Sequence, residues 1–136
     1  MRRLKQVGQT CTITALAMLL DQEPSYIADM LGKDGSVGQE VHIQEIQDFL
    51  LNQGRHLYEI EFCPSLPSGP IYDYDYALSR MLNLIADHKA MLYVQGGTTR
   101  HMLAWDGRQA IDPATGEPTH LPTWRIYSAY ILGGML

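Results

Sequence analysis

Apolar residues at helical spacing predict that the first half of the chain is largely helical. Four of them each lie three or four residues from another member of the set: Ile13, Leu16, Ala17 and Leu20. A helix should therefore begin at Cys11, with Thr10 as its cap. A short second helix, capped by Ser25, is expected to end at Gly32. The apolar positions of residues 41–51 predict a third, amphipathic helix.

The second half of the chain contains several segments that are typical of strands. "HLYEIEF" predicts a first strand, the proline-marked loop "CPSLPSGP" follows it, and "DYALSRMLNLIAD" predicts a fourth helix. Four further strands are expected in "AMLYVQ", "HMLAW", "RQAID" and "TWRIYSAYIL". Helices that precede a mostly antiparallel sheet indicate an α+β fold. A length of 136 residues with 46% hydrophobic content suits one domain, residues 1–136.

Composition and charge exclude several classes of protein. The formal net charge is −5 and the basic residues cluster only in "RRLK" at the N-terminus, so we expect no nucleic-acid partner. Polar "QVGQTCT" separates that basic segment from apolar "ITALAMLL", and no apolar segment approaches the roughly 20 residues that span a bilayer. We therefore expect the N-terminal segment to belong to the mature protein and not to a secretory signal, and we expect no membrane association. Two cysteines are too few for a disulfide scaffold, which suggests a reducing, cytoplasmic compartment.

The position of Cys11 raises the question of whether this residue packs or reacts. On an apolar helix, a free cysteine is usually a packing residue. The first turn of a helix, however, lowers the pKa of a thiol, and a histidine base oriented by a third group would activate it further. Five histidines are available for that role: His42, His56, His88, His101 and His120.

One histidine comes with a geometric argument. The Asp-Gly pair at positions 106–107, within "HMLAWDGRQAID", is the strongest short-range signal for a two-residue hairpin turn. In that register His101 faces Asp112 on one face of the sheet, with Cβ atoms about 5 Å apart. Asp112 can then accept the Nδ1 proton of His101 and leave Nε2 free for a thiol. Trp105 faces Arg108 in the same register, so these two side chains can stack.

The order of these residues resembles that of papain-like cysteine peptidases, in which a cysteine at a helix N-terminus precedes a histidine and then an aspartate on successive strands. The pattern "Q…C….LAMLL", the segments "PSYIADMLG" and "IQEIQDFLLNQG", and the closing "H…WDG…IDPATGE" look like the small bacterial and phage domains related to the double-glycine leader peptidases. The resemblance covers nearly the whole chain. It implies a papain-like fold and four roles: Cys11 as nucleophile, His101 as base, Asp112 as orienting residue and Gln6 as oxyanion donor.

Three features depart from that family's pattern. Gln6 lies one residue closer to Cys11 than is usual, and Thr12 stands where these relatives often have glycine. The histidine and the aspartate are only eleven residues apart, which the tight hairpin explains. Gln9 remains an alternative oxyanion donor, although it is close in sequence for the same reach.

The remaining candidate residues suggest no other chemistry. Cys63 has no partner that the sequence can place, and we expect it to be structural. No metal-binding spacing such as C-x-x-C occurs, so neither a metal nor a cofactor is expected. We expect His42, His56 and His88 to face solvent, and we hold His120 in reserve as an alternative base.

The leading hypothesis is a cysteine peptidase that cleaves a peptide or isopeptide bond in a peptide or protein substrate, with acyl transfer to an amine as a variant of the same chemistry. The alternative is a catalytically silent papain-like binding module. A third hypothesis, an interaction protein of a phage or mobile element, rests only on the kind of genome in which such small domains occur. Neither the substrate nor the oligomeric state follows from the sequence.

Overall fold

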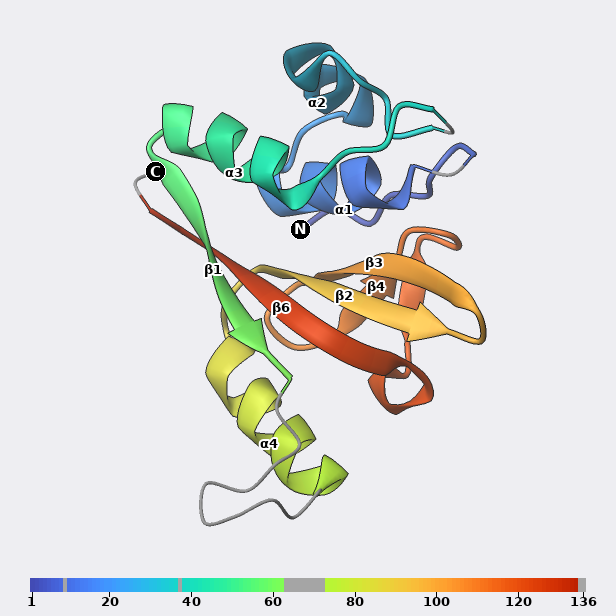
Figure 1. Ribbon diagram of the computed structural model, residues 1–136, viewed down its shortest axis with the longest axis vertical. Helices are drawn as coiled ribbons and strands as arrows, with labels where there is room; N and C mark the ends of the chain where they lie inside the picture. Colours follow the sequence, from blue (N-terminus) through green and yellow to red (C-terminus); the bar gives the residue numbers. More distant parts are fainter. Residues whose placement is uncertain (9, 37, 63–72, 135–136) are drawn as a thin grey trace.

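The computed structural model describes residues 1–8, 10–36, 38–62 and 73–134 of the chain. The fold is α+β, as predicted. Three helices near the N-terminus cover one face of a six-stranded antiparallel sheet, and a fourth helix packs on the other face (Figure 1). The predicted loop "CPSLPSGP", which contains Cys63, lies outside the described residues. Among the helices that are described, none is long and apolar enough to cross a membrane.

Helix α1, Cys11–Leu20, is the central helix of the molecule. It lies between the sheet on one side and helices α2, Pro24–Leu31, and α3, Ile43–Asn52, on the other (Figure 1). All residues from Ile13 to Leu19 are buried as a result. This burial on every side explains why "ITALAMLL" is apolar all round, where a surface helix would carry a one-sided stripe.

The starts of α2 and α3 differ in detail from the predictions. Helix α2 begins at Pro24, whose fixed backbone angle suits the first helical position, so the predicted cap Ser25 lies inside the helix. It ends at Gly32 with a positive φ of 71°, as predicted. Helix α3 starts where the Glu45 carboxylate accepts a hydrogen bond from the backbone amide of His42.

The sheet has the strand order β1-β6-β2-β3-β4-β5, and each pair of neighbours is antiparallel. The strands are β1, Arg55–Glu61; β2, Ala90–Gly96; β3, Thr99–Trp105; β4, Ala110–Asp112; β5, Glu117–Thr119; and β6, Arg125–Gly134. Between the predicted strands "RQAID" and "TWRIYSAYIL", the sequence predicts no further helix or strand. The structure places β5 and a short 3-10 helix, Leu121–Thr123, in that segment, because elements of three residues are too short to show a period.

Each face of the sheet carries its own hydrophobic core. One core packs against α1 and α3, and the other against α4, Tyr74–Ile85. Trp105 belongs to the α4 core, where its Nε1 donates to the Ile85 carbonyl at 3.0 Å. The prediction that Trp105 faces Arg108 is wrong, because Trp105 pairs with Ala110 across the hairpin.

Candidate active site

Cys11 is half-buried at the first position of α1. Thr10 occupies the cap position, as predicted, but its hydroxyl donates to the Val7 carbonyl and forms no capping hydrogen bond. Within the described part of the chain, no side chain caps this end of the helix. The sulfur lies 3.9 Å from the Thr12 hydroxyl, and it interacts with the His101 side chain and the backbone amide of Met102 on β3.

His101 and Asp112 form a hydrogen-bonded pair. Nε2 of His101 lies 2.6 Å from Oδ1 of Asp112, and the two side chains are only 11% and 13% exposed. The same carboxylate oxygen accepts the backbone amide of Ala114 at 2.9 Å, which holds it in place. The predicted ring orientation is wrong. Asp112 meets Nε2 and not Nδ1, so Nδ1 is the nitrogen left for Cys11.

The register of the β3–β4 hairpin differs from the predicted register by two residues. Ala104 pairs with Ile111, so the turn holds four residues, 106–109, where the sequence predicts two. Asp106 shapes this turn, because its carboxylate accepts two backbone amides within it. A shift of two residues keeps each side chain on its own face of the sheet. The histidine and the aspartate are thus diagonal neighbours and not directly opposed, which still leaves them within reach.

Cys11 and His101 shift each other's pKa toward the charged forms. Burial raises the pKa of the Cys11 thiol, but hydrogen bonds from His101 and the Met102 amide, together with the charge of His101, outweigh burial, so this pKa is lowered. Burial lowers the pKa of His101, but hydrogen bonds and charges at Cys11 and Asp112 outweigh burial, so this pKa is raised. Both shifts favour a thiolate beside an imidazolium.

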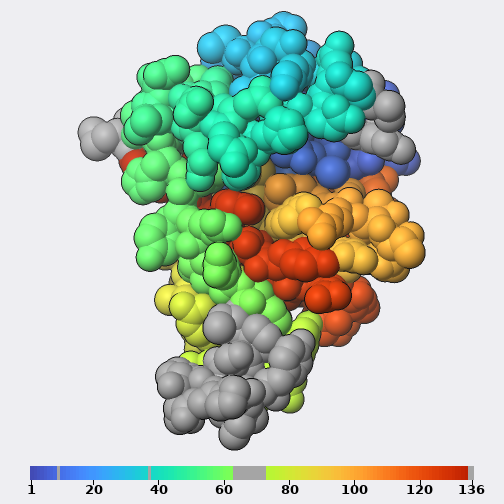
Figure 2. Space-filling model, in the orientation of Figure 1, coloured from blue at the N-terminus to red at the C-terminus, as the bar shows by residue number. Residues whose placement is uncertain are grey.

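A cleft of about 310 Å³ opens beside Cys11. Its walls come from the N-terminal segment, the loop before α3 and the β2–β3 hairpin: Gln6, Cys11, Gly35, Ser36, Glu40, Thr99, Arg100 and His101. Figure 2 shows the blue surface of the α1 region directly above the orange surface of the hairpin on the viewed face. The thiol and the imidazole therefore border one solvent-accessible space.

Gln6 reaches this cleft, but its side-chain amide is engaged elsewhere. Nε2 donates to the Gly8 carbonyl at 2.7 Å, and Oε1 is buried without a partner among the described residues. The backbone amide of Gln6 donates to the Pro113 carbonyl at 2.7 Å, which ties the N-terminal segment to the loop after β4. Gln9, the alternative oxyanion donor, lies outside the described residues.

Sequence reasoning missed Trp124, which stacks on the ring of His101. The two ring centroids are 5.5 Å apart and the rings are inclined by 20°. The indole Nε1 donates to the Thr119 hydroxyl at 3.0 Å, and the indole packs directly over Gly96 of β2. The indole thus covers one face of the imidazole, and we expect this contact to hold the ring beside the thiol. No period or spacing signals this contact, because Trp124 stands alone between the 3-10 helix and β6.

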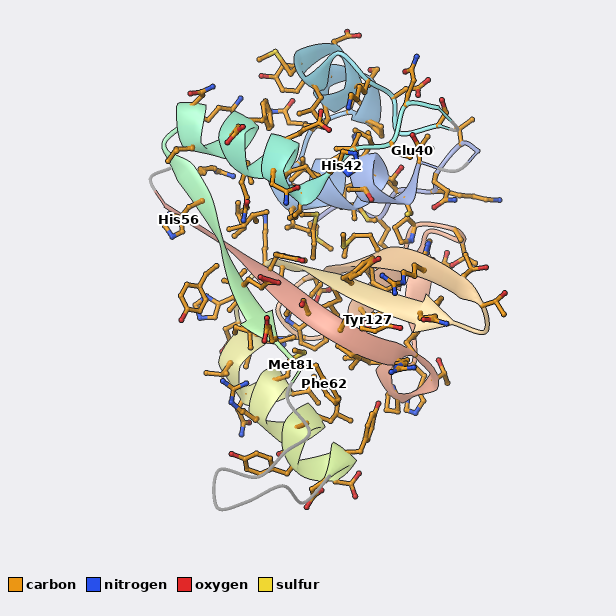
Figure 3. The ribbon with its side chains drawn as sticks, in the orientation of Figure 1. Glu40, His42, His56, Phe62, Met81 and Tyr127 are labelled. Atoms are coloured by element: carbon orange, nitrogen blue, oxygen red, sulfur yellow. The ribbon has the colours of Figure 1, made fainter. Side chains whose placement is uncertain are left out.

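The other four histidines do not join the site. His42, His56, His88 and His120 are exposed, which confirms the prediction for the first three, and none of the four lines the cleft. Figure 3 labels His42 at the start of α3 and His56 on β1. Within the described ranges, no group of three side chains could hold a metal ion.

Comparison of the chain with protein-family models, curated proteins and solved structures found no match. A thiol at a helix N-terminus contacts an imidazole, and the imidazole contacts a buried carboxylate. Such an arrangement can generate a thiolate at neutral pH and move a proton to or from a reacting group beside it.

Proposed function

We propose that the protein is a papain-like cysteine peptidase, a thiol hydrolase that cleaves a peptide or isopeptide bond. The observation that carries this proposal is the run of contacts from Cys11 to His101 to Asp112 at the border of one cleft. The α+β layout supports it too, because the helix that bears the cysteine packs against an antiparallel sheet that bears the histidine and the aspartate.

The first half of the reaction uses the thiolate–imidazolium pair. The Cys11 sulfur attacks the carbonyl carbon of the substrate, a C–S bond forms, and the carbonyl electron pair moves onto oxygen. His101 then donates its Nδ1 proton to the leaving nitrogen as the C–N bond breaks. The products of this half are a free amine and a thioester between the acyl group and Cys11.

The second half returns the enzyme to its starting state. Water attacks the thioester while Nδ1 of His101 accepts its proton, and the C–S bond breaks to release the acid and the Cys11 thiolate. Asp112 accepts the Nε2 proton of His101 in a hydrogen bond throughout, which orients the ring and stabilises its cationic form. An amine in place of water gives acyl transfer by the same steps.

The developing oxyanion needs hydrogen-bond donors. The backbone N–H of Cys11 is one, because the first amides of a helix have no acceptor within the helix. Gln6 is the second donor in the proposal. Its Nε2 must leave the Gly8 carbonyl and turn into the cleft to serve, so we expect substrate binding to reorient this side chain.

The proposal places the whole of residues 1–136 in one peptidase domain that acts on a peptide or protein substrate without a metal or a cofactor. A compartment that keeps Cys11 reduced suits this chemistry, so we propose the cytoplasm as the site of action. A cleft of about 310 Å³ on so small a domain offers few specificity contacts. The substrate is therefore expected to lie extended across the site.

Cleavage of a synthetic peptide pool, read by mass spectrometry, tests the proposal. Wild-type protein should generate new peptide termini at a consistent set of bonds. Cys11→Ala should generate none, while Cys63→Ala, which removes the other cysteine of the chain, should cleave as the wild type does. If the wild type leaves the pool intact, or if Cys11→Ala cleaves equally well, the peptidase proposal fails. Retained peptide binding without cleavage would then favour the binding-module alternative.

A further inference from the structure

Arg100, the residue that precedes His101, borders the same cleft as Cys11. Its guanidinium carbon lies 5.0 Å from the ring centroid of Tyr127 and 5.7 Å from that of Tyr93. Its Nη1 donates to the Tyr93 hydroxyl at 3.0 Å. Although Arg100 is exposed, two rings and one hydrogen bond hold its charge at the cleft.

Arg125 brings a second guanidinium to the same tyrosine. Its guanidinium carbon lies 5.3 Å from the Tyr127 ring centroid. The Tyr127 hydroxyl is hydrogen-bonded to Oε1 of Gln95, whose Nε2 in turn donates to the Gly97 carbonyl at 2.9 Å. Figure 3 labels Tyr127 on β6, at the end of the sheet where the β2–β3 hairpin turns. Arg100 and Arg125 thus share one platform that is itself tied to the hairpin; we call this pair with Tyr93 and Tyr127 the arginine platform.

The two arginines carry unneutralised charge. Within the described ranges, no carboxylate forms an ion pair with either of them, as is also the case for four further basic residues, whereas Arg2, Arg3, Lys33 and Lys89 each have one. The chain as a whole has a formal net charge of −5, so the platform is a local exception beside the nucleophile. A guanidinium has five N–H donors, and Arg100 uses one of them on Tyr93, which leaves a fork free for an anion.

We propose that the arginine platform binds a carboxylate of the peptide substrate, a few residues from the bond that is cleaved. That the bound carboxylate belongs to a substrate rests on the proposed peptidase function. That the platform binds an anion rests only on the geometry of the platform. A carboxylate suits the geometry because a planar guanidinium pairs with it through two parallel hydrogen bonds. The carboxylate belongs either to an Asp or Glu side chain or to the free C-terminus of the substrate.

The two opposite walls of the cleft carry opposite charges. Glu40 lines the wall opposite Arg100, from the loop before α3, and its Oε1 accepts the backbone amide of Gly38 at 3.3 Å. Figure 3 labels Glu40 among the helical elements, across from the sheet that carries Tyr127. A substrate carboxylate is repelled by Glu40 and attracted by Arg100, so it should lie on the hairpin side of Cys11.

The test uses Cys11→Ala protein, so that bound peptides are not consumed. Two pools of synthetic peptides with randomised positions, one with free C-terminal acids and one with C-terminal amides, are presented to the immobilised protein, and the bound fraction is read by mass spectrometry. We expect about fivefold enrichment of Asp and Glu over Asn and Gln in the amide pool, or of free acids over amides. The first result assigns a side-chain carboxylate, and the second assigns the substrate terminus.

Charge reversal connects the enrichment to the platform. Arg100→Glu should remove it and favour Lys and Arg instead, and Arg125→Glu should weaken it. Arg80→Glu, on the exposed surface of α4 across the sheet from the helical layer, makes the same charge change as a matched control and should leave it unchanged. Arg100→Gln repeats the test without a new charge, in case the reversed variant fails to fold.

The outcomes separate this inference from the proposed function. Absence of enrichment in both pools overturns the inference, as does enrichment that survives Arg100→Glu and Arg100→Gln. Cleavage by the wild type with no acidic preference refutes the platform and leaves the peptidase proposal intact. Acidic enrichment by the Cys11→Ala protein, with no cleavage by the wild type, supports the platform as an anion site and refutes the peptidase proposal.

Discussion

The contact between Gly96 and Trp124 gives a sharp test of how the imidazole is held. A Cβ added at Gly96 would lie 2.6 Å from Cζ3 and 3.0 Å from Cε3 of the Trp124 ring. Real Cβ atoms do not approach a ring atom so closely, so Gly96→Ala must displace the indole. Because that indole stacks on His101, the substitution should disturb the base although it touches neither His101 nor Cys11.

The size of the effect follows from the packing. Overpacking of this kind costs about 1–3 kcal/mol of unfolding free energy. Displacement of the ring also removes a stacking contact of about 0.5–1.5 kcal/mol and should weaken the Trp124–Thr119 hydrogen bond. In a Trp124→Ala background the obstructing ring is absent. Gly96→Ala should then be neutral or slightly stabilising, because alanine loses less backbone entropy than glycine in a strand.

Urea denaturation of the four proteins in this double-mutant cycle measures the coupling free energy. We expect a coupling of at least about 1 kcal/mol. The alkylation rate of Cys11 provides a second readout. Gly96→Ala should lower this rate when Trp124 is present and leave it unchanged in the Trp124→Ala background. If Gly96→Ala destabilises the two backgrounds equally, or leaves both stability and Cys11 reactivity unchanged, the claim that Trp124 positions His101 is wrong.

Three further predictions concern the site and the core. Asp112→Asn keeps an oxygen that can accept from Nε2 but removes the negative charge that helps to raise the pKa of His101, so that pKa should fall, as an NMR titration of the ring will show; an unchanged titration would contradict the pairing. Gln6→Ala should lower kcat by about 10²-fold with little change in KM, and an unchanged kcat would remove Gln6 from the oxyanion role. Leu16→Ala, at a fully buried position of α1, should cost about 2–5 kcal/mol in urea denaturation, and a cost below 1 kcal/mol would contradict its central place.

The sequence was sufficient to predict the fold class and most of its elements, because the relevant signals are local. Apolar spacing located α1, α3 and α4, alternation located β1, and strand-like segments between turn signals located β2, β3 and β6. Element starts were less certain, since side-chain capping competes with backbone geometry. Ser25 is a good cap residue in general, yet proline at position 24 sets the start of α2 earlier.

At the site, the sequence was sufficient to predict which residues share a face of the sheet. It was not sufficient to predict the turn length, the ring orientation or the tertiary contacts. His101 and Asp112 share a face of the sheet in both the predicted and the observed register, because the two registers differ by an even number. The side-chain hydrogen bonds of Asp106 lengthened the turn, which a dipeptide signal does not reveal. The choice between Nε2 and Nδ1 depends on the rotation of the His101 ring. Trp124 reaches that ring only through tertiary packing.

The central claim is that Cys11 is a thiolate activated by His101, and the alkylation rate of Cys11 by iodoacetamide between pH 5 and 9 tests it most directly. Mass spectrometry follows the Cys11 peptide in wild type and His101→Ala, with each protein unfolded in urea as the reference for an ordinary thiol. Because the pKa of Cys11 is lowered, folded wild type should react well below the pH at which the unfolded chain does, and His101→Ala should lose this advantage. A Cys11 that is inert when folded, or that follows the unfolded reference in both proteins, would contradict the claim.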